Sequence, residues 1–128
     1  MIMDMDLLKF RTLKLKLQQQ GELSLKVASG SMIPVLKIGQ IITVKKAQPW
    51  ELKKFDILVF WQSEKLMCHF LWSKQKQFKG KEVRFITKSL ENPREIDLPL
   101  KECLLLGKVD VTIPLSFKIK VWLKNLND

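Results

Sequence analysis

Two serines flank a glycine at Ser29-Gly30-Ser31, and Pro34 follows shortly after them. Glycine permits a tight turn and proline stiffens the exit from it, so the backbone and both hydroxyls of this stretch can approach a substrate closely. Ser31 is therefore a candidate nucleophile. The same residues also occur in ordinary turns, so other groups in the chain must distinguish a reactive serine from a structural one.

A serine hydroxyl is a weak nucleophile at neutral pH and needs a base within hydrogen-bond reach. The only histidine of the chain, His69, lies in the apolar run 66–71, where it is either a base or a packed structural residue. A third group would orient its imidazole. Asp97, Glu91 and Asn92 are candidates, because they fall in a polar segment after an expected strand, where solvation alone would also explain them.

The 128 residues are 46% hydrophobic and 28% charged, which indicates a single folded globular domain. Cys68 and Cys103 lack the spacing of a zinc site, so we expect free buried thiols, no metal and no cofactor. The 23 Lys and Arg against 13 Asp and Glu give a net charge of +10. The lysines are scattered and no nucleic-acid-reading motif accompanies them, so we expect a solvated basic surface and no specific nucleic acid partner.

Hydrophobic periodicity predicts a mainly β fold with an N-terminal helix that ends near Gly21. Residues 5–20 fit a helix, although Leu13, Leu15 and Leu17 also alternate with lysines as in a strand. Alternating or short apolar runs predict strands at 23–27, 41–44, 57–61, 65–72, 83–87 and 103–109. Turn residues separate them, at Lys79-Gly80 among other places, and the spacing favours a compact antiparallel sheet or small barrel.

No apolar run is long enough to cross a bilayer, and the first residues do not form a secretory signal, so we expect a cytoplasmic protein with no transmembrane segment. The tail segment 117–124 alternates apolar with basic residues and includes Trp122. It fits an edge strand or a short surface helix. We favour the edge strand, and weak contact of this tail with an anionic membrane surface is the other interpretation.

Taken in order, several of these segments resemble the signal peptidase I and LexA-like serine peptidase superfamily. The similar segments are 27–39, 55–60, 67–70, 87–92 with Asp97, and 106–109, within about residues 23–109. The resemblance implies a coiled, mostly β peptidase fold in which Ser31 is the nucleophile. It implies that Ser29, Met32 and Pro34 form the turn that binds the oxyanion and substrate. His69 stands where bacterial members carry a lysine base, as in the endoplasmic-reticulum and archaeal type, and Asp97 matches an acidic position.

The chain departs from the family at three Gly-Asp pairs, which are here Gly39-Gln40, Phe55-Asp56 and Ser89-Leu90. Leu90 cannot orient an imidazole, which leaves Asp97 as the acidic partner and Glu91 as a weaker substitute. The family's membrane anchor has no counterpart, so the chain resembles soluble, stand-alone members.

The resemblance thus implies one peptidase domain over 1–128, with an N-terminal helix (1–21), a catalytic core (22–110) and a C-terminal tail (111–128). We expect a monomeric serine endopeptidase that hydrolyses a peptide or precursor-protein substrate through a Ser-His-Asp acyl-enzyme mechanism. The alternative is a catalytically weakened peptidase-fold protein with a binding or regulatory role.

Overall fold

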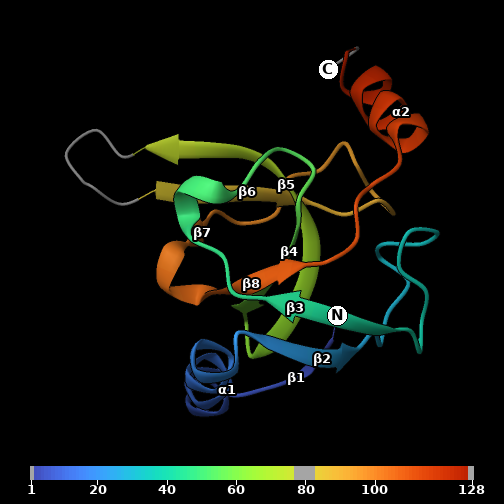
Figure 1. The fold of residues 1–128 in the computed structure, drawn as a ribbon. Coiled ribbons are helices and arrows are strands. Elements are labelled where there is room, and N and C mark those ends of the chain that lie inside the picture. The colour runs from blue at the N-terminus through green and yellow to red at the C-terminus, as the bar shows by residue number, and fades with distance from the viewer. Residues whose placement is uncertain (1, 77–82, 127–128) are drawn as a thin grey trace.

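In the computed structural model, which describes residues 2–76 and 83–126, the chain forms a curved antiparallel sheet with a helix near each end of the sequence (Figure 1). The turn expected at Lys79-Gly80 and the last two residues of the expected tail lie outside the described residues. The prediction of a mainly β fold with an N-terminal helix is confirmed.

The N-terminal helix α1 spans Leu7–Gln20. Asp6 caps its start by accepting a hydrogen bond from the Lys9 N–H, and Gly21 ends it with φ of 81°, a left-handed conformation that suits glycine. Phe10 and Leu17, two turns apart, are buried against the sheet, whereas Leu15 is 60% exposed. The helical reading of this leucine-rich stretch is therefore the correct one.

The sheet order is β2-β3-β8-β4-β5-β6-β7, and β1 pairs with β5 beside this path. Every pairing is antiparallel, and β2 and β7 end the order, so the sheet curves without closing into the small barrel that was the alternative. The strands are β1 (Met3–Asp4), β2 (Glu22–Lys26), β3 (Ile41–Lys45), β4 (Ile57–Gln62), β5 (Lys65–Lys76), β6 (Val83–Lys88), β7 (Leu100–Lys101) and β8 (Leu105–Val109). Short 3₁₀ turns, η1 (Pro49–Glu51) and η2 (Glu102–Leu104), lie between them.

The central hairpin β4-β5 is buried on both faces over Ile57 to Phe60 and most of Leu66 to Leu71, whereas residues 73–75 of β5 are exposed. Ile57 and Val59 point into the core beneath α1, and Leu58 and Phe60 point into a second apolar cluster on the opposite face. A continuous apolar strand is what burial on both sides requires. The two-residue turn at Ser63 and Glu64 has positive φ at both positions, as in the type I′ turns that join antiparallel strands. The hairpin is thus the rigid centre of the molecule.

Two expectations are wrong, and one strand begins later than expected. The tail is the helix α2 (Leu115–Asn125) and not an edge strand, because Phe117 and Val121, one turn apart, both pack inward. Cys103 is exposed in η2, whereas Cys68 is buried as expected. The strand expected from residue 103 begins only at Leu105, because η2 occupies the preceding residues.

Candidate active site

Ser29 and Ser31 lie in the loop that joins β2 to β3. The base of this loop is closed by hydrogen bonds from the Val27 N–H to the Gln40 carbonyl (2.9 Å) and from the Gly39 N–H to the Val27 carbonyl (2.8 Å). Gly39 has φ of 85°, which permits that closure. Inside the loop, Ser29 Oγ and Ser31 Oγ are 3.4 Å apart, so the two hydroxyls share a hydrogen bond.

His69 occupies the middle of β5 and is 6% exposed. Its neighbours Cys68 and Phe70 point into the core beneath α1, so alternation along the strand turns the imidazole to the opposite face. There it lies edge-on to the Phe60 ring at 6.1 Å between ring centroids. A rigid strand and an aromatic neighbour therefore fix the orientation of the ring.

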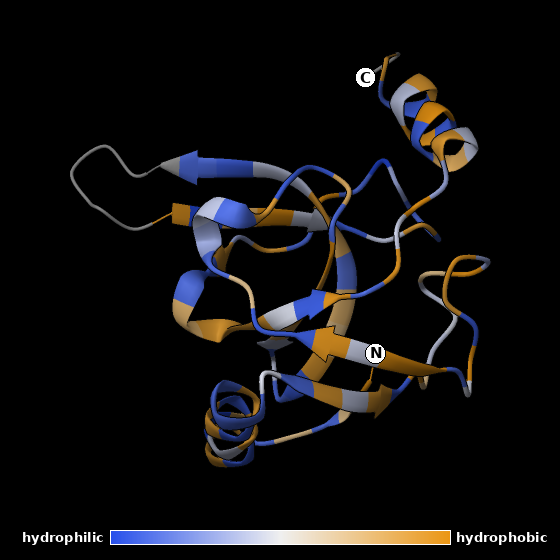
Figure 2. Ribbon diagram, in the orientation of Figure 1, coloured by the Kyte–Doolittle hydropathy of each residue, from blue (hydrophilic) through white to orange (hydrophobic). Residues whose placement is uncertain are grey.

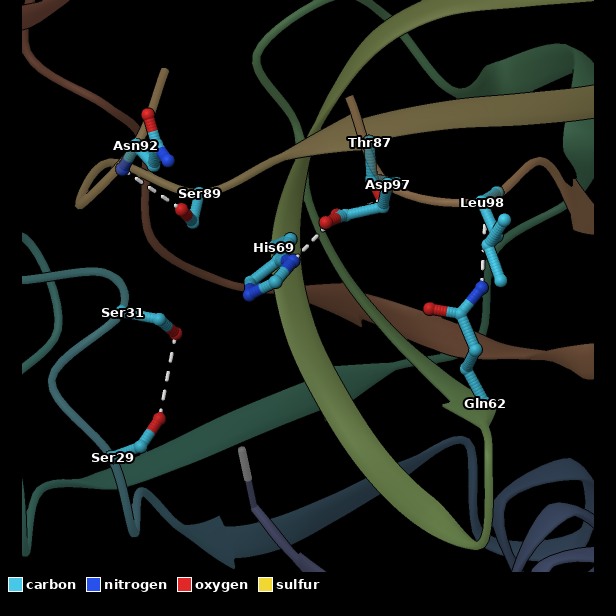
Figure 3. A network of polar contacts seen from close by, with 9 residues as sticks. All are labelled: Ser29, Ser31, Gln62, His69, Thr87, Ser89, Asn92, Asp97 and Leu98. Carbon is cyan, nitrogen blue, oxygen red and sulfur yellow. Dashed lines mark hydrogen bonds and ion pairs between the residues drawn. The ribbon is translucent and has the colours of Figure 1, made fainter. Parts of the chain in front are cut away.

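Asp97 contacts the imidazole directly, with 2.6 Å between Asp97 Oδ2 and His69 Nδ1. The same carboxylate oxygen accepts a hydrogen bond from Thr87 Oγ1 (2.7 Å), and the Asp97 N–H donates to the Thr87 carbonyl (2.9 Å). At the end of β4, Gln62 Nε2 donates to the Leu98 carbonyl at 3.2 Å and holds the next residue in place (Figure 3). Asp97 is thus attached to two strands of the sheet.

The environment of Asp97 favours its ionised form. Partial burial raises the pKa of the carboxyl, but the hydrogen bond and the charge of His69, together with the Thr87 hydroxyl, outweigh it and leave the pKa below its usual value. A carboxylate beside Nδ1 fixes the tautomer that carries its proton there. The second ring nitrogen, Nε2, then presents a lone pair.

The imidazole lies between Asp97 and the two serines, and Nε2 points toward the side on which Ser29 and Ser31 lie (Figure 3). In the described part of the chain no hydrogen bond joins Ser31 to His69, and every buried side-chain nitrogen or oxygen has a partner. Among the described residues no hydrogen bond to Nε2 occurs, so this nitrogen is not completely buried.

The segment 89–95 lies beside the serine loop and is hydrogen-bonded to it. The Glu91 N–H donates to the Ser31 carbonyl at 3.0 Å, and Ser89 Oγ accepts from the Asn92 N–H at 3.0 Å. The carboxylate of Glu91 is exposed, and Asn92 is exposed as well, so neither side chain replaces Asp97 beside the imidazole. Leu90 packs against the core.

Met32 and Pro34, which the resemblance implies for the turn that binds the substrate, differ in their exposure. Met32 is 1% exposed and lies in the core, so its side chain anchors the serine loop and leaves only its main chain for a substrate. Pro34 is exposed and follows a cis peptide bond.

Thr87 was not expected to hold the acid. The residue precedes Lys88 in the segment that resembles the family, but its contact with Asp97 depends on how the chain returns beside β6, which local sequence does not show. Lys88 is 2% exposed and donates from Nζ to Asn125 Oδ1 at 2.6 Å, with Nζ 4.1 Å from the centroid of the Trp72 ring. Its ammonium group is therefore engaged with α2 and Trp72.

No group of three or more metal-ligating side chains occurs in residues 2–76 and 83–126, and no helix there is long and apolar enough to span a membrane. A separate cavity of about 420 Å³ lies between α1 and the 3₁₀ turns, lined by Lys14, Trp50 and Cys103 among others. Burial lowers the pKa of Lys14 there, and its Nζ donates to the Cys103 carbonyl at 3.0 Å. This cavity includes none of the serine, histidine or aspartate residues described above.

Searches with this chain against protein-family models, curated proteins and solved structures gave no match.

Proposed function

We propose that this chain is a serine endopeptidase resembling signal peptidase I, with Ser31 as nucleophile, His69 as base and Asp97 as the group that orients the base. The observation that carries the proposal is the contact of 2.6 Å between Asp97 Oδ2 and His69 Nδ1, in a ring whose Nε2 is turned toward the serine side. A structural histidine does not require a carboxylate on one nitrogen and two hydroxyl-bearing residues on the side of the other. That pairing supports a base.

In the proposed reaction, Ser31 Oγ attacks the carbonyl carbon of a peptide bond while its proton passes to His69 Nε2. The tetrahedral intermediate collapses, the C–N bond breaks, and Nε2 returns the proton to the leaving amine. Water then attacks the acyl ester with the same histidine as base, which releases the acid and restores Ser31. Ser29 Oγ, 3.4 Å from Ser31 Oγ, is the candidate side-chain donor to the oxyanion.

The backbone at one departure from the family supports the resemblance. Phe55 stands where a glycine is usual, and its φ is 73°, in the left-handed region that glycine normally occupies. Its N–H and the carbonyl of Asp56 both pair with Leu71. The turn thus has the backbone conformation that glycine adopts most easily, although phenylalanine stands at this position.

A second candidate is a peptidase-fold protein with a binding or regulatory role. The observation that favours it is the hydrogen bond between the two serine hydroxyls, because Ser31 is engaged with Ser29 and not with His69. The peptidase proposal requires Ser31 to exchange this partner for Nε2 when a substrate binds. Catalytic hydrogen bonds often form only in the substrate complex.

Covalent labelling by a fluorophosphonate, followed by intact mass, separates the two candidates. The parent protein should gain one adduct, and Ser31→Ala and His69→Ala should gain none. Ser29→Ala should label more slowly, by about tenfold to a thousandfold, because one donor to the oxyanion is lost. Ser73→Ala, at an exposed serine of β5, is the matched control and should label like the parent.

Labelling that persists in Ser31→Ala would contradict the peptidase proposal. A folded parent protein that gains no adduct at any pH would favour the binding or regulatory role.

A further inference from the structure

Helix α2 attaches to the body of the protein by one face. Val121 is 3% exposed in the core, and Phe117 packs against the same cluster one turn earlier. Asn125, one turn later, donates from Nδ2 to the Pro93 carbonyl at 3.1 Å and accepts from Lys88 Nζ. Residues at intervals of four lie on the same side of a helix, so this side is occupied by the protein itself.

The opposite face of α2 is apolar and exposed, and hydrophobic residues alternate with hydrophilic ones along the helix (Figure 2). We define this outer face by five residues that are each about half or more exposed. They are Leu115 (70%), Ile119 (48%), Trp122 (55%), Leu123 (50%) and Leu126 (56%). Their spacing is that of a single helical stripe, so the outer face is continuous.

A groove of about 310 Å³ extends this outer face toward the body of the protein, between Lys54, Phe55, Lys118 and Trp122. Its rim is basic. Lys118 Nζ lies 5.7 Å from the centroid of the Phe55 ring, and Lys54 Nζ lies 3.7 Å from the centroid of the Trp72 ring. Ammonium groups thus stand beside an apolar depression.

Charge on the helix is of one sign. Lys118, Lys120 and Lys124 flank the outer face, and residues 115–126 contain no Asp or Glu. An apolar stripe with an aromatic residue such as Trp122, bordered by lysines, is the arrangement of helices that lie in the interface of a bilayer.

We propose that the outer face of α2 rests on a membrane that contains anionic phospholipid, with the helix parallel to the surface. Leu115, Ile119 and Trp122 would enter the boundary between headgroups and acyl chains, and the flanking lysines would contact lipid phosphates. A second copy of the chain is a poorer occupant, because it would bring the same lysines together on a molecule of net charge +10. The proposal does not depend on peptidase activity.

The hydrogen bonds that attach α2 to the body of the protein would also orient the protein on the membrane. Asn125 bonds to the carbonyl of Pro93, in the segment whose Glu91 N–H holds the Ser31 carbonyl. A membrane bound to the outer face therefore has a fixed relation to the serine loop.

Co-sedimentation of the full chain with lipid vesicles tests the proposal. The probes are vesicles of phosphatidylcholine alone and of equal parts phosphatidylcholine and phosphatidylglycerol. We expect binding to the anionic vesicles that weakens as salt is added. Lys120→Gln with Lys124→Gln should weaken it by about twenty-five-fold, since each lysine near an anionic surface contributes about fivefold.

Ile119→Ser with Trp122→Ser should remove most of the binding, while Leu8→Ser is the matched control. Leu8 is 74% exposed on α1 beside lysines, so its replacement should leave binding unchanged. All these side chains are exposed, and unchanged thermal unfolding of each variant confirms an intact fold.

Three results would overturn the proposal. They are equal binding to neutral and anionic vesicles, no binding to either, and a loss in Leu8→Ser as large as in the α2 variants. Concentration-dependent self-association that disappears in Ile119→Ser with Trp122→Ser, without vesicle binding, would assign the outer face to a second copy instead.

Discussion

The carboxylate of Asp97 is held more firmly than a partner of a surface histidine would need to be. Its Oδ2 atom is hydrogen-bonded to both the imidazole of His69 and the hydroxyl of Thr87. The backbone N–H of Asp97 donates to the Thr87 carbonyl. A carboxylate fixed in this way sets both the tautomer and the direction of the ring. At the scale of single residues, the site is therefore tested best through Asp97.

Asp97→Asn should slow the labelling of Ser31 by about a hundredfold or more, because an amide neither stabilises the imidazolium nor fixes the tautomer as well. Labelling rates of the parent and the variant at pH 7.5 or so would measure this. Glu91→Gln is the control, since the Glu91 carboxylate is exposed, and it should label at the parent rate. An unchanged rate in Asp97→Asn would remove Asp97 from the mechanism.

Asp97 should also make stability depend on pH. Its pKa is lowered in the folded protein, so the unfolded chain takes up the proton more readily. The stabilisation is therefore complete above the unfolded value of about 3.9 and is lost as the pH falls through the lower, folded value.

The free energy of unfolding of the parent should exceed that of Asp97→Asn between about pH 5 and 6, and the gap should narrow below about pH 4. Urea denaturation at each pH measures it. A gap that stays the same across this range would show that the carboxylate is not stabilised by its neighbours.

The pH dependence of labelling distinguishes a histidine base from a lysine base. Histidine titrates near 6.5 in model peptides and lysine near 10.4, and a base must be unprotonated to act. With a histidine base, we expect the labelling rate to be level already at a pH well below the range in which a lysine loses its proton. Lys88→Met should show the same profile, because Lys88 Nζ contacts Asn125 and Trp72. A rise that begins only above about pH 8 would assign the base to a lysine.

At the scale of elements, the packing of α1 on the sheet depends on a glycine in β8. A Cβ built on Gly107 would lie 2.4 Å from the Lys45 carbonyl oxygen in β3 and 3.2 Å from Leu17 Cδ2 in α1. The backbone of β3 cannot move away without disturbing β2, which carries the chain into the serine loop. The close approach of β3, β8 and α1 therefore requires a residue with no side chain.

Gly107→Ala should lower the free energy of unfolding by about 1 to 3 kcal/mol, the usual cost of forcing atoms into a packed site. Gly39→Ala is a useful comparison, because open space surrounds that position and only its φ of 85° opposes a side chain. Its cost should be about 1 kcal/mol. Thermal unfolding of both variants measures the difference, and equal losses would show that the contact with Lys45 relaxes.

The elements also show how far local sequence patterns reach. Alternation and apolar runs predicted β2 to β6, and Gly21 predicted the end of α1, because these signals depend on nearby residues. The prediction of an edge strand in the tail was wrong because the lysines there recur at both the strand period and the helical period. Pro114, which directly precedes the first residue of α2 and cannot continue a central strand, was the local signal against a strand here.

The site was only partly predictable for the same reason. The resemblance selected Ser31, His69 and Asp97, and the contact of Asp97 with His69 is present. The Thr87 hydroxyl on Asp97 and the Glu91 N–H on the Ser31 carbonyl arise where distant segments meet. No local sequence pattern predicts these two hydrogen bonds, because they depend on the register of β6 and on the path of the segment after it.

At the scale of the whole molecule, charge and apolar surface have to be considered together. The net charge of +10 was expected to form a solvated surface, and most lysines are exposed. On α2, however, lysines border exposed Leu115, Ile119 and Trp122. Composition gives the sum of the charges, and only the fold shows that some of them flank an apolar stripe.

The sheet order has a consequence for when the proposed site forms during folding. Ser31 precedes β3, His69 lies on β5, and Asp97 follows β6, so the three come to lie on one side of the sheet only after pairings between segments distant in the sequence have formed. Closing such long loops is slow, and the chain gains little until the pairings are complete. In the proposed mechanism, a partly folded chain would therefore hold Ser31 apart from its base. Newly made protein would not react with a fluorophosphonate until the sheet has assembled, so the onset of labelling would report the end of folding.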